Sequence, residues 1–451
     1  ELSLIDLESV YNIDDLNKIS KHNAKVKPDY YYTELQKIWR KKMDNRVISF
    51  IQPSRNNLKY LKWSYNSIRK NLGYRHEICW ADDFSDDGTW EWMQEIAEKD
   101  KNVKIHRNEG PTRLGHTILY DTLINDYATN DVVMIYHADM YACPRLDEEV
   151  LRHIEPGVVV SGTRIEPPLH PDGPEKILKD FGIEPEEFDE HGLIEFLNTE
   201  VMNQYGTGIT TEGIFAPWAI LKSDWDYIGG HDPIFAPQSK EDSDIFNRFH
   251  LAGYKFKQTW GGFVYHMTCR GSRFKDGAMR NPAGQVFMKG RESDEWLKQN
   301  LKSTREFIRK WGHMVKHDKM MKPIVPPKYD VAFVAYNCTK EMLNELEPWC
   351  SKIYLDLRDS DNMTEYKKEE QPKTSTDLDE KMKLYGNSKI SELHDVCVEF
   401  DCNQLNANNF QHLVNLSQII EDSGEVGVSQ LDIFKVYISK LDTYENELIR
   451  L

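Results

Sequence analysis

The sequence predicts an α/β fold, in which a mostly parallel sheet is flanked by helices and a smaller C-terminal α/β domain follows. Two apolar runs carry most of this prediction. Residues 78–89 and 132–140 each have the pattern of a buried strand that ends abruptly at acidic and small residues. Helical patterns alternate with such strands, which is typical of right-handed βαβ units. Because ligands bind just past the carboxyl ends of strands in an open α/β sheet, the acidic strand ends mark the candidate site.

The first part of the chain alternates strands and helices after an N-terminal helical extension over residues 1–45. Strands are expected at four places, residues 47–54, 77–81, 102–108 and 131–136. Helices between them are expected at residues 58–73, 89–99 and 117–127. The first of these helices stops at Gly73, a residue that often terminates helices.

From Pro144 the alternation loosens. We expect a Pro-rich loop at 166–176, an acidic and largely helical stretch at 174–205, and renewed sheet content at 213–225. A helix at 241–251, a pair of strands at 254–267 and a long helix at 293–311 complete a domain over residues 46–315.

A Lys-, Met- and Pro-rich linker at 316–328 leads to a C-terminal domain at 329–451. Its first strand, a helix through Leu346 and the strand at 352–357 predict a second βαβ unit. Residues 359–385 are polar and charged and are expected to form a mobile loop. A strand near 396–400 and at least two helices close the chain. We leave the role of this domain open between acceptor docking and homo-oligomerisation.

Composition limits the classes of partner. The formal net charge is −17, and the acidic excess is concentrated after Pro326, which disfavours duplex nucleic acid. The sequence contains no apolar run of 18 or more residues and no signal-like segment, so we expect no membrane span and a cytoplasmic location. Seven scattered cysteines without CxxC spacing are expected to be reduced thiols in a cytosol-like compartment.

His137 and Asp139 end the second acidic strand and are candidate ligands of a divalent cation. Mg²⁺ or Mn²⁺ bound to a diphosphate needs only one or two protein ligands. His266, which follows the apolar run at 261–265, could complete the shell as a neutral imidazole. The alternative is that Asp139 caps a turn and His137 is an interior histidine.

Asp82 and Asp83 follow the strand at 77–81 and could accept hydrogen bonds from a nucleotide base or ribose. Ser85, Asp86 and Asp87 come next, and N-capping of the helix at 89–99 explains some of these residues.

Glu241 and Asp242 open a helix after a Gly- and Pro-rich loop. One of them could be a general base that deprotonates an acceptor hydroxyl, with Asp244 a weaker candidate. The alternative is that these carboxylates only stabilise the helix dipole.

Arg270, Arg273 and Lys275 lie beside two glycines and could neutralise a leaving diphosphate. The alternative is an ordinary solvated loop.

Together these segments resemble the family 2 inverting glycosyltransferases with the Rossmann-like GT-A fold, over about residues 47–273. The sequence DDFSDDGT resembles the family's nucleotide-binding aspartate motif, HAD stands in place of its DxD metal motif, and KEDSDIFNRFHLAGY resembles its ED helix. QPSRNN and RLGHTILYD are similar to its first-strand and phosphate-side segments. YHM occurs where some members keep a metal-binding histidine.

The resemblance implies a role for each matching residue. Asp242, with Glu241, would be catalytic. Asp139, His266 and His137 would hold Mn²⁺ or Mg²⁺. A nucleoside-diphosphate sugar, a UDP-sugar favoured over a GDP-sugar, would contact a larger set: Pro53, Arg55, Asp82, Asp83, Arg113, Gly115, Ala138, Arg270 and Arg273. The reaction would be a single displacement that inverts the anomeric centre, without a covalent intermediate. One departure is that His137 replaces the first aspartate of DxD, which leaves ligation to Asp139 and His266.

Two other functions are compatible with an α/β sheet of this kind. A nucleotidyltransferase would carry a Gly-rich, basic loop after its first strand, and QPSRNN contains no glycine. A non-catalytic glycan-binding or scaffold protein is favoured by His137 and disfavoured by the intact Glu241–Asp242 pair. We expect a glycan acceptor, with a protein or a modified nucleic acid as the alternatives. Four aromatic residues near the ED helix could stack on sugars or belong to the core: Trp218, Trp225, Tyr227 and Trp260.

Overall fold

The structure is a computed structural model, and it describes residues 46–268, 278–288, 293–385 and 393–451. The expected helical extension at 1–45 lies outside the described residues. None of the helices in the described ranges has the length and apolar character needed to cross a membrane.

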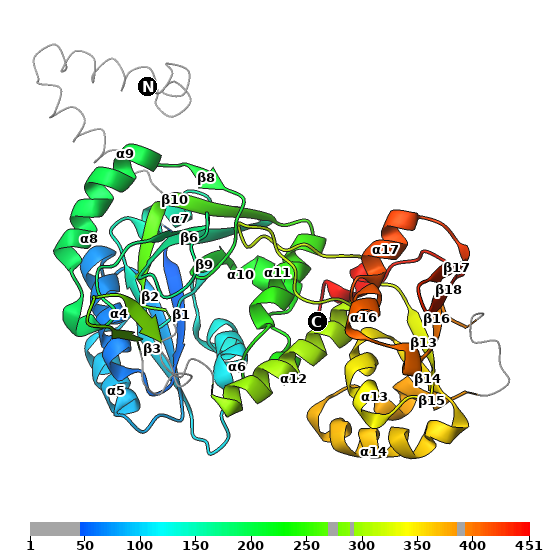
Figure 1. The fold of residues 1–451 in the computed structure, drawn as a ribbon. Coiled ribbons are helices and arrows are strands. Elements are labelled where there is room, and N and C mark those ends of the chain that lie inside the picture. Colours follow the sequence, from blue (N-terminus) through cyan, green and yellow to red (C-terminus); the bar gives the residue numbers. More distant parts are fainter. Residues whose placement is uncertain (1–45, 269–277, 289–292, 386–392) are drawn as a thin grey trace, which may run out of the picture. The chain divides into compact units, whose positions relative to one another are not determined.

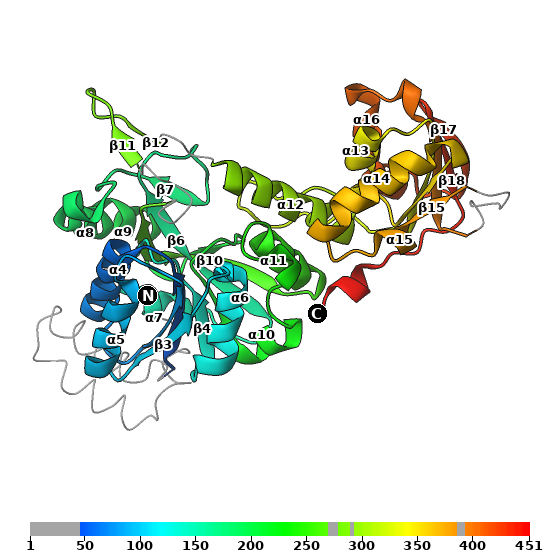
Figure 2. The ribbon, with the colours of Figure 1, turned by 90° about the horizontal axis from the view of Figure 1, so that it is seen from below.

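The strands of the first βαβ units form one half of a large sheet (Figure 1). They are β1 (Ile48–Ser54), β2 (Glu77–Asp83), β3 (Val103–Asn108) and β4 (Val132–Ile135), parallel and in the order β3-β2-β1-β4. The helices between them are α4 (Leu58–Asn71), α5 (Thr89–Lys99) and α6 (Gly115–Thr122), the last extended by a π-helical turn at Leu123–Tyr127. Figure 2 shows α4 and α5 on one face and α6 on the other, as right-handed crossovers on either side of β1 require.

The strand order reverses at β1, because β2 lies on one side of it and β4 on the other. Such a topological switch leaves a crevice at the carboxyl ends of the two strands. Every residue of β2 and β4, and all but one of β1, is buried, as expected for parallel strands covered on both faces. The sheet therefore holds the loops after β1 and β4 side by side on a rigid base.

The other half of the sheet continues from β4 in the order β9-β6-β10-β5. These strands are β5 (Met140–Ala142), β6 (Val158–Glu166), β9 (Trp218–Leu221) and β10 (Lys255–His266), with β7 (Lys176–Leu178) paired to β6 and β8 (Thr210–Thr211) to β10. The expected strand pair at 254–267 is wrong, since one strand, β10, spans it. Its register against β6 shifts between Thr259 and Phe263, where the Gly-Gly pair lets the Glu149 side chain approach the backbone.

The remaining elements of this part are mostly short. The helices are α7 (Leu146–Leu151), α8 (Glu190–Phe196), α9 (Met202–Tyr205), α10 (Lys222–Ile228), α11 (Glu241–Leu251) and α12 (Asp294–Trp311). A π-helical stretch at Leu197–Val201 joins α8 to α9, and β11 (Ala278–Arg280) pairs with β12 (Val286–Met288). The long helix at 293–311 agrees with the sequence prediction. The stretch at 174–205 is helical only in part, because β7 and mostly irregular backbone occupy its first half and continuous helix begins at Glu190.

A second sheet forms the C-terminal region, in the order β15-β14-β13-β16-β18-β17. Its strands are β13 (Val331–Tyr336), β14 (Lys352–Leu355), β15 (Met382–Leu384), β16 (Val396–Asp401), β17 (Gly427–Leu431) and β18 (Phe434–Ile438). Its helices are α13 (Lys340–Leu346), α14 (Ser360–Glu370), α15 (Leu378–Lys381), α16 (Ala407–Val414) and α17 (Leu416–Ser423). The β17–β18 hairpin was not expected from the sequence.

The expected mobile loop at 359–385 is also wrong, because these residues form α14, α15 and β15. Helix α14 lacks an apolar stripe and instead buries polar groups. The Tyr366 hydroxyl donates to Glu347 at 2.8 Å, and Glu370 accepts from Arg305 of α12 at 2.9 Å. Paired charges, which sequence reasoning assigns to solvent, therefore attach this helix to its neighbours.

Residues of the expected linker and of the C-terminus both contact segments that flank the first sheet. Ile214 N–H donates to the Met320 carbonyl at 3.4 Å, and Arg450 Nε donates to the Tyr227 carbonyl at 3.0 Å.

The cysteines of the described residues are buried free thiols, in agreement with the prediction of reduced cysteines: Cys79, Cys143, Cys338, Cys350, Cys397 and Cys402.

Candidate active site

A cavity of about 570 Å³ opens at the carboxyl ends of the first sheet's strands. Many of its lining side chains come from the loops after β1 and β4, from the first turns of α6 and α11, and from the ends of β6 and β10. Most of the residues predicted for the site line it, namely Pro53, Arg55, Asp83, Arg113, His137, Ala138, Asp139, Glu241, Asp242 and His266. The crevice at the β1–β4 switch is therefore the place where the sequence-predicted residues meet.

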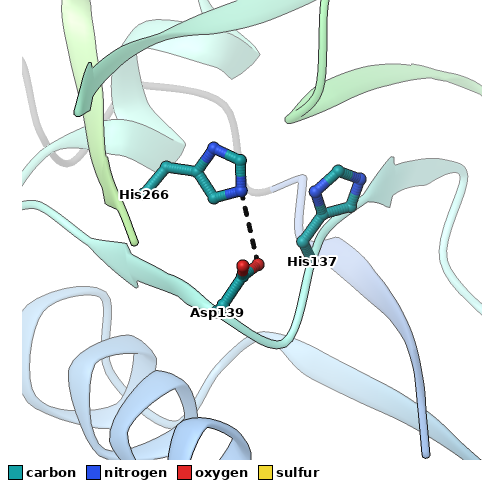
Figure 3. Close-up of side chains that lie close together, drawn as sticks. All are labelled: His137, Asp139 and His266. Atoms are coloured by element: carbon teal, nitrogen blue, oxygen red, sulfur yellow. Dashed lines mark ion pairs between the residues drawn. The ribbon is translucent and has the colours of Figure 1, made fainter. Parts of the chain in front are cut away.

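His137, Asp139 and His266 converge on one point (Figure 3). One potential ligand atom from each lies within 4.8 Å of the others, and His266 Nε2 is 3.3 Å from Asp139 Oδ1. His137 and Asp139 lie in the tight connection between β4 and β5. His266 is the last residue of β10, which pairs antiparallel with β5 and so brings it opposite Met140. Two imidazoles and a carboxylate in this arrangement can hold a divalent cation.

Glu166, at the end of β6, fixes the orientation of His266. Its Oε1 lies 2.9 Å from His266 Nδ1, which directs Nε2 toward Asp139. Glu166 is buried and is itself paired with Arg164 at 3.0 Å and Lys176 at 3.2 Å. A carboxylate that orients a histidine in this way is the usual outer support of a metal-binding imidazole. Sequence reasoning missed Glu166 because it is 100 residues away from His266.

The two histidines of this cluster differ in protonation. Burial and the nearby His266 lower the pKa of His137 to about 4, so His137 is neutral at neutral pH. For His266, burial opposes protonation, but the negative charges of Asp139 and Glu166 outweigh it and raise its pKa to about 9. A cation at this point would take over the role of that proton.

Glu241 and Asp242 form the first turn of α11 and face the same cavity. Burial and the adjacent Glu241 carboxylate raise the pKa of Asp242 to about 6. Within the described part of the chain, no group donates a hydrogen bond to the Asp242 carboxylate. Asp242 is thus a half-buried carboxylate with free lone pairs and a pKa near neutrality, which are the properties of a general base.

The loop that leads into α11 has an unusual backbone. Ser239 and Lys240 both have positive φ, 83° and 74°, a region that non-glycine residues seldom adopt. Helix α12 holds this loop in place. Asn300 Oδ1 accepts from Ser239 Oγ at 2.8 Å and from Lys240 Nζ at 3.1 Å, and Gln299 donates to the Gln238 carbonyl. Strained backbone of this kind is often found at functional sites, and here it sets the position of Asp242.

His116, in the first turn of α6, is a second residue that sequence reasoning missed. Its Nε2 lies 2.6 Å from Glu241 Oε1, while the other Glu241 oxygen is buried with no hydrogen-bond partner among the described residues. Burial opposes protonation of His116, but the charge of Glu241 and the hydrogen bond to it raise the pKa of His116. The two residues therefore form an ion pair next to Asp242.

Asp83 anchors the start of α6. Its carboxylate accepts from the backbone N–H groups of Leu114 at 3.0 Å and Gly115 at 2.8 Å, and from Asn108 Nδ2 at 2.8 Å. Arg113 lies 3.5 Å from Asp83 and donates to Gln238 at 2.9 Å. Asp83 thus places Arg113 and His116 on the cavity wall.

Several predicted residues lie elsewhere. Asp82 is buried behind the cavity wall, close to Ser85 and Arg107. Gly115 does not line the cavity and instead packs against Pro237. Arg270 and Arg273 lie outside the described residues. The N-cap position of α5 is Gly88, and Asp87 just before it accepts from Thr89 N–H at 3.1 Å, so this carboxylate binds the start of the helix, close to what the capping alternative expects.

Other candidates belong to the core. Asp244 is buried and bonded to Arg248 and Trp311. Trp218, Trp225 and Trp260 are buried too, in agreement with the core alternative, and Tyr227 is exposed with Arg450 over its ring.

Residues 49–208 match a family model described as "Glycosyl transferase family 2". This region is a family 2 glycosyltransferase domain. The matched region begins in β1 and contains Asp82, Asp83, His137 and Asp139. The resemblance to family 2 glycosyltransferases is thus confirmed over residues 49–208. The expected fold class is confirmed too: a GT-A-like α/β fold with a curled, mostly parallel sheet, plus a second sheet in the C-terminal region.

Two solved structures of glycosyltransferases are similar to the chain. The crystal structure of GalNAc-T7 with UDP, GalNAc and Mn²⁺ has a TM-score of 0.41 and 13% identity, and the match covers 59% of this chain and 49% of that one. The mannosyltransferase PcManGT from Pyrobaculum calidifontis, in complex with GDP-Man and Mn²⁺, has a TM-score of 0.36 and 18% identity, with 53% and 64% covered. The chain thus spans about half of the first relative and less than two thirds of the second. No curated protein matches the sequence.

The glycosyltransferase domain and the residues after it both contribute to the cavity. The family match ends at residue 208, whereas Glu241, Asp242 and His266 come later in the chain. The sheet order explains how they join, because β10, which follows α11 in the chain, pairs with both β5 and β6. The predicted base and the third predicted metal ligand are therefore brought to the matched region by the fold.

Proposed function

We propose that the protein transfers a sugar from a nucleoside-diphosphate sugar to a hydroxyl group of a glycan acceptor, by a single displacement that inverts the anomeric centre. The observation that carries this proposal is the shared cavity: Asp242 and the cluster of His137, Asp139 and His266 face the same space. A base on one side and a diphosphate-binding group on the other are what in-line displacement of a nucleoside diphosphate requires.

The donor nucleotide would bind at the carboxyl ends of β1 and β2. Two buried polar atoms at the end of β1 have no hydrogen-bond partner among the described residues, Ser54 Oγ and Arg55 Nε, and both residues line the cavity. Both atoms can donate a hydrogen bond, which suits the phosphate oxygens of a nucleoside diphosphate. Arg55 and Arg113 add positive charge on the cavity wall, where a diphosphate would gain from it.

A divalent cation fits the cluster of His137, Asp139 and His266. The donor set contains two imidazole nitrogens, which favours Mn²⁺ over Mg²⁺, since Mg²⁺ takes mainly oxygen ligands. When bound, such a cation supplies positive charge that offsets the charge developing on the leaving diphosphate. The buried Glu166 keeps His266 in the orientation that this role requires.

Asp242 would accept the proton of the acceptor hydroxyl as that oxygen attacks the anomeric carbon. Its pKa of about 6 leaves it ionised at neutral pH and still basic enough to take a proton in the transition state. Leu119 and Tyr120 of α6 line the same cavity as this carboxylate. An oxygen nucleophile held by Asp242 would approach from the side opposite the diphosphate.

The test is release of nucleoside diphosphate from a panel of UDP- and GDP-sugars, measured with Mn²⁺ and with EDTA. The proposal predicts that one donor turns over, that EDTA stops turnover, and that added Mn²⁺ restores it. Proton NMR of the first-formed product would then show the inverted anomer. Retention of configuration, or full turnover in EDTA, would contradict the mechanism. Absence of nucleotide binding across the whole panel would favour the non-catalytic glycan-binding alternative.

A further inference from the structure

His116 lies in the segment RLGHTILYD and Glu241 in the ED helix, and the motif resemblance assigns no role to their pairing. His116 comes from α6 and Glu241 from α11, 125 residues later. Their side chains meet at 2.6 Å on the cavity wall, and 35% of the His116 side chain remains exposed to that space. Asp242, the next residue, faces the same space. Any change in the charge of this pair is therefore felt by the proposed base.

From this geometry we propose that His116 is a positioning residue that keeps Asp242 ionised, by pairing its positive charge with Glu241. The inference rests on the proposed function, in which Asp242 accepts the proton of the acceptor. Without the positive charge of His116 beside it, the Glu241 carboxylate would be an uncompensated negative charge adjacent to the proposed base, Asp242. Two neighbouring carboxylates in a partly buried site disfavour each other's ionisation.

The fold holds this contact rigidly. Asp83 binds the backbone N–H groups at the start of α6, and Gly115 lies so close to the loop before α11 that a Cβ there would fall 2.0 Å from the Pro237 carbonyl oxygen. Thr117 Oγ1 donates to the same carbonyl at 3.4 Å. The start of α6 and the start of α11 are thus one packed unit, and the His116–Glu241 distance is set by backbone contacts.

The charges around Asp242 come from three elements. Glu241 lies on its own helix, and its charge raises the pKa of Asp242. His231, in the loop before α11, and His116 of α6 act in the opposite direction, and the effect of His231 is the larger. His231 is held by Asp121 at 2.8 Å, and the Tyr120 ring lies between the two histidines, 5.9 Å from His116 and 5.7 Å from His231. His116 is the histidine in direct contact with Glu241, so its loss is the change that leaves the Glu241 carboxylate without a paired positive charge.

The proposal predicts opposite effects for the two members of the pair. His116→Gln retains a donor for Glu241 and removes the positive charge, so the pKa of Asp242 should rise by about one unit. Glu241→Gln removes the negative charge, so the pKa of Asp242 should fall. His106→Gln is a matched control, because His106 is a histidine of β3 that pairs with the Tyr127 hydroxyl at 3.1 Å and does not line the cavity.

The direct measurement is carbon NMR of the full chain labelled at the aspartate carboxyl carbons, titrated from pH 4 to 9 without substrate. The Asp242 signal is assigned by its loss in Asp242→Asn. We expect its midpoint to move up in His116→Gln, down in Glu241→Gln, and to stay in place in His106→Gln. An unchanged midpoint in His116→Gln would overturn the inference, whatever the enzyme's activity.

Kinetics give a second readout. With the donor found in the panel, kcat/KM of His116→Gln should be about fivefold below wild type at pH 6 and nearly equal to it at pH 8. These ratios follow if the pKa of Asp242 rises by about one unit, from about 6 to about 7. A purely structural role would lower kcat/KM by the same factor at every pH and would refute the inference. If Asp242→Asn retains full activity, the proposed function fails and the NMR result still stands on its own.

Discussion

Gly115 is the position at which a single methyl group tests the architecture of the site. Its φ is +77°, and a Cβ would lie 2.0 Å from the Pro237 oxygen and 2.4 Å from the Pro237 Cα. The left-handed conformation costs an alanine about 1–2 kcal/mol. Backbone displacement to relieve the overlap adds about 1–3 kcal/mol. We therefore expect Gly115→Ala to lower the free energy of unfolding by about 2–5 kcal/mol.

Gly73 supplies the matched control, because its φ is +85° and a Cβ there would meet nothing within 4 Å. Gly73→Ala should cost only the conformational part, about 1–2 kcal/mol. Urea unfolding followed by tryptophan fluorescence compares the two variants. The displacement in Gly115→Ala should also separate His116 from Glu241 and lower turnover, whereas Gly73→Ala should leave turnover unchanged. Equal destabilisation by the two substitutions would refute the packing argument.

Three further predictions follow from buried charges. Asp139→Ala should abolish Mn²⁺ binding measured by calorimetry, and binding with wild-type affinity would remove Asp139 from the metal site. Glu166→Gln should weaken Mn²⁺ binding about 10–100-fold through the loss of support for His266, whereas Glu175→Gln, which alters only the pairing of Arg164 in this cluster, should not. Burial opposes ionisation of Glu347, but Lys381 and Arg309 outweigh it and hold its pKa at about 2 rather than 4.5. The Glu347 carboxylate therefore stabilises the fold above pH 4.5, by about 3 kcal/mol, and this contribution is lost as the pH falls toward 2. Glu347→Gln should flatten that part of the stability profile in urea unfolding, and an unchanged slope would contradict the assignment.

The sequence predicts the first sheet well because its strands are short, apolar and bounded by polar residues. The parallel strands β1, β2 and β4 carry such patterns, and the loops after them carry the residues of the nucleotide and metal motifs. The carboxyl ends of parallel strands in an α/β sheet lie at one edge, so the sequence alone predicts that Asp83 and Asp139 belong to one site. His266 and Asp242 could be added through the motif resemblance.

The other site residues and helix α14 could not be predicted, because they depend on long-range contacts that leave no pattern in the neighbouring sequence. His116 and Glu166 each pair with a residue at least 100 positions away. His116 lies in the segment RLGHTILYD, but the motif resemblance assigns a role to neither residue. Asp83 has the residue type of a ligand-binding group, but its oxygens bind the backbone of residues 114 and 115. Helix α14 was missed because its buried face carries Tyr366 and Glu370 in place of an apolar stripe. In each case, long-range pairing of polar groups decided the structure.

The measurement that tests the account most directly is the transfer rate of Asp242→Asn at saturating donor and Mn²⁺. The substitution keeps the size of the side chain and removes its basicity. If Asp242 is the general base, the rate should fall by about 10²–10⁴-fold, while calorimetry gives unchanged affinities for Mn²⁺ and nucleoside diphosphate. A rate within tenfold of wild type would contradict the proposed mechanism.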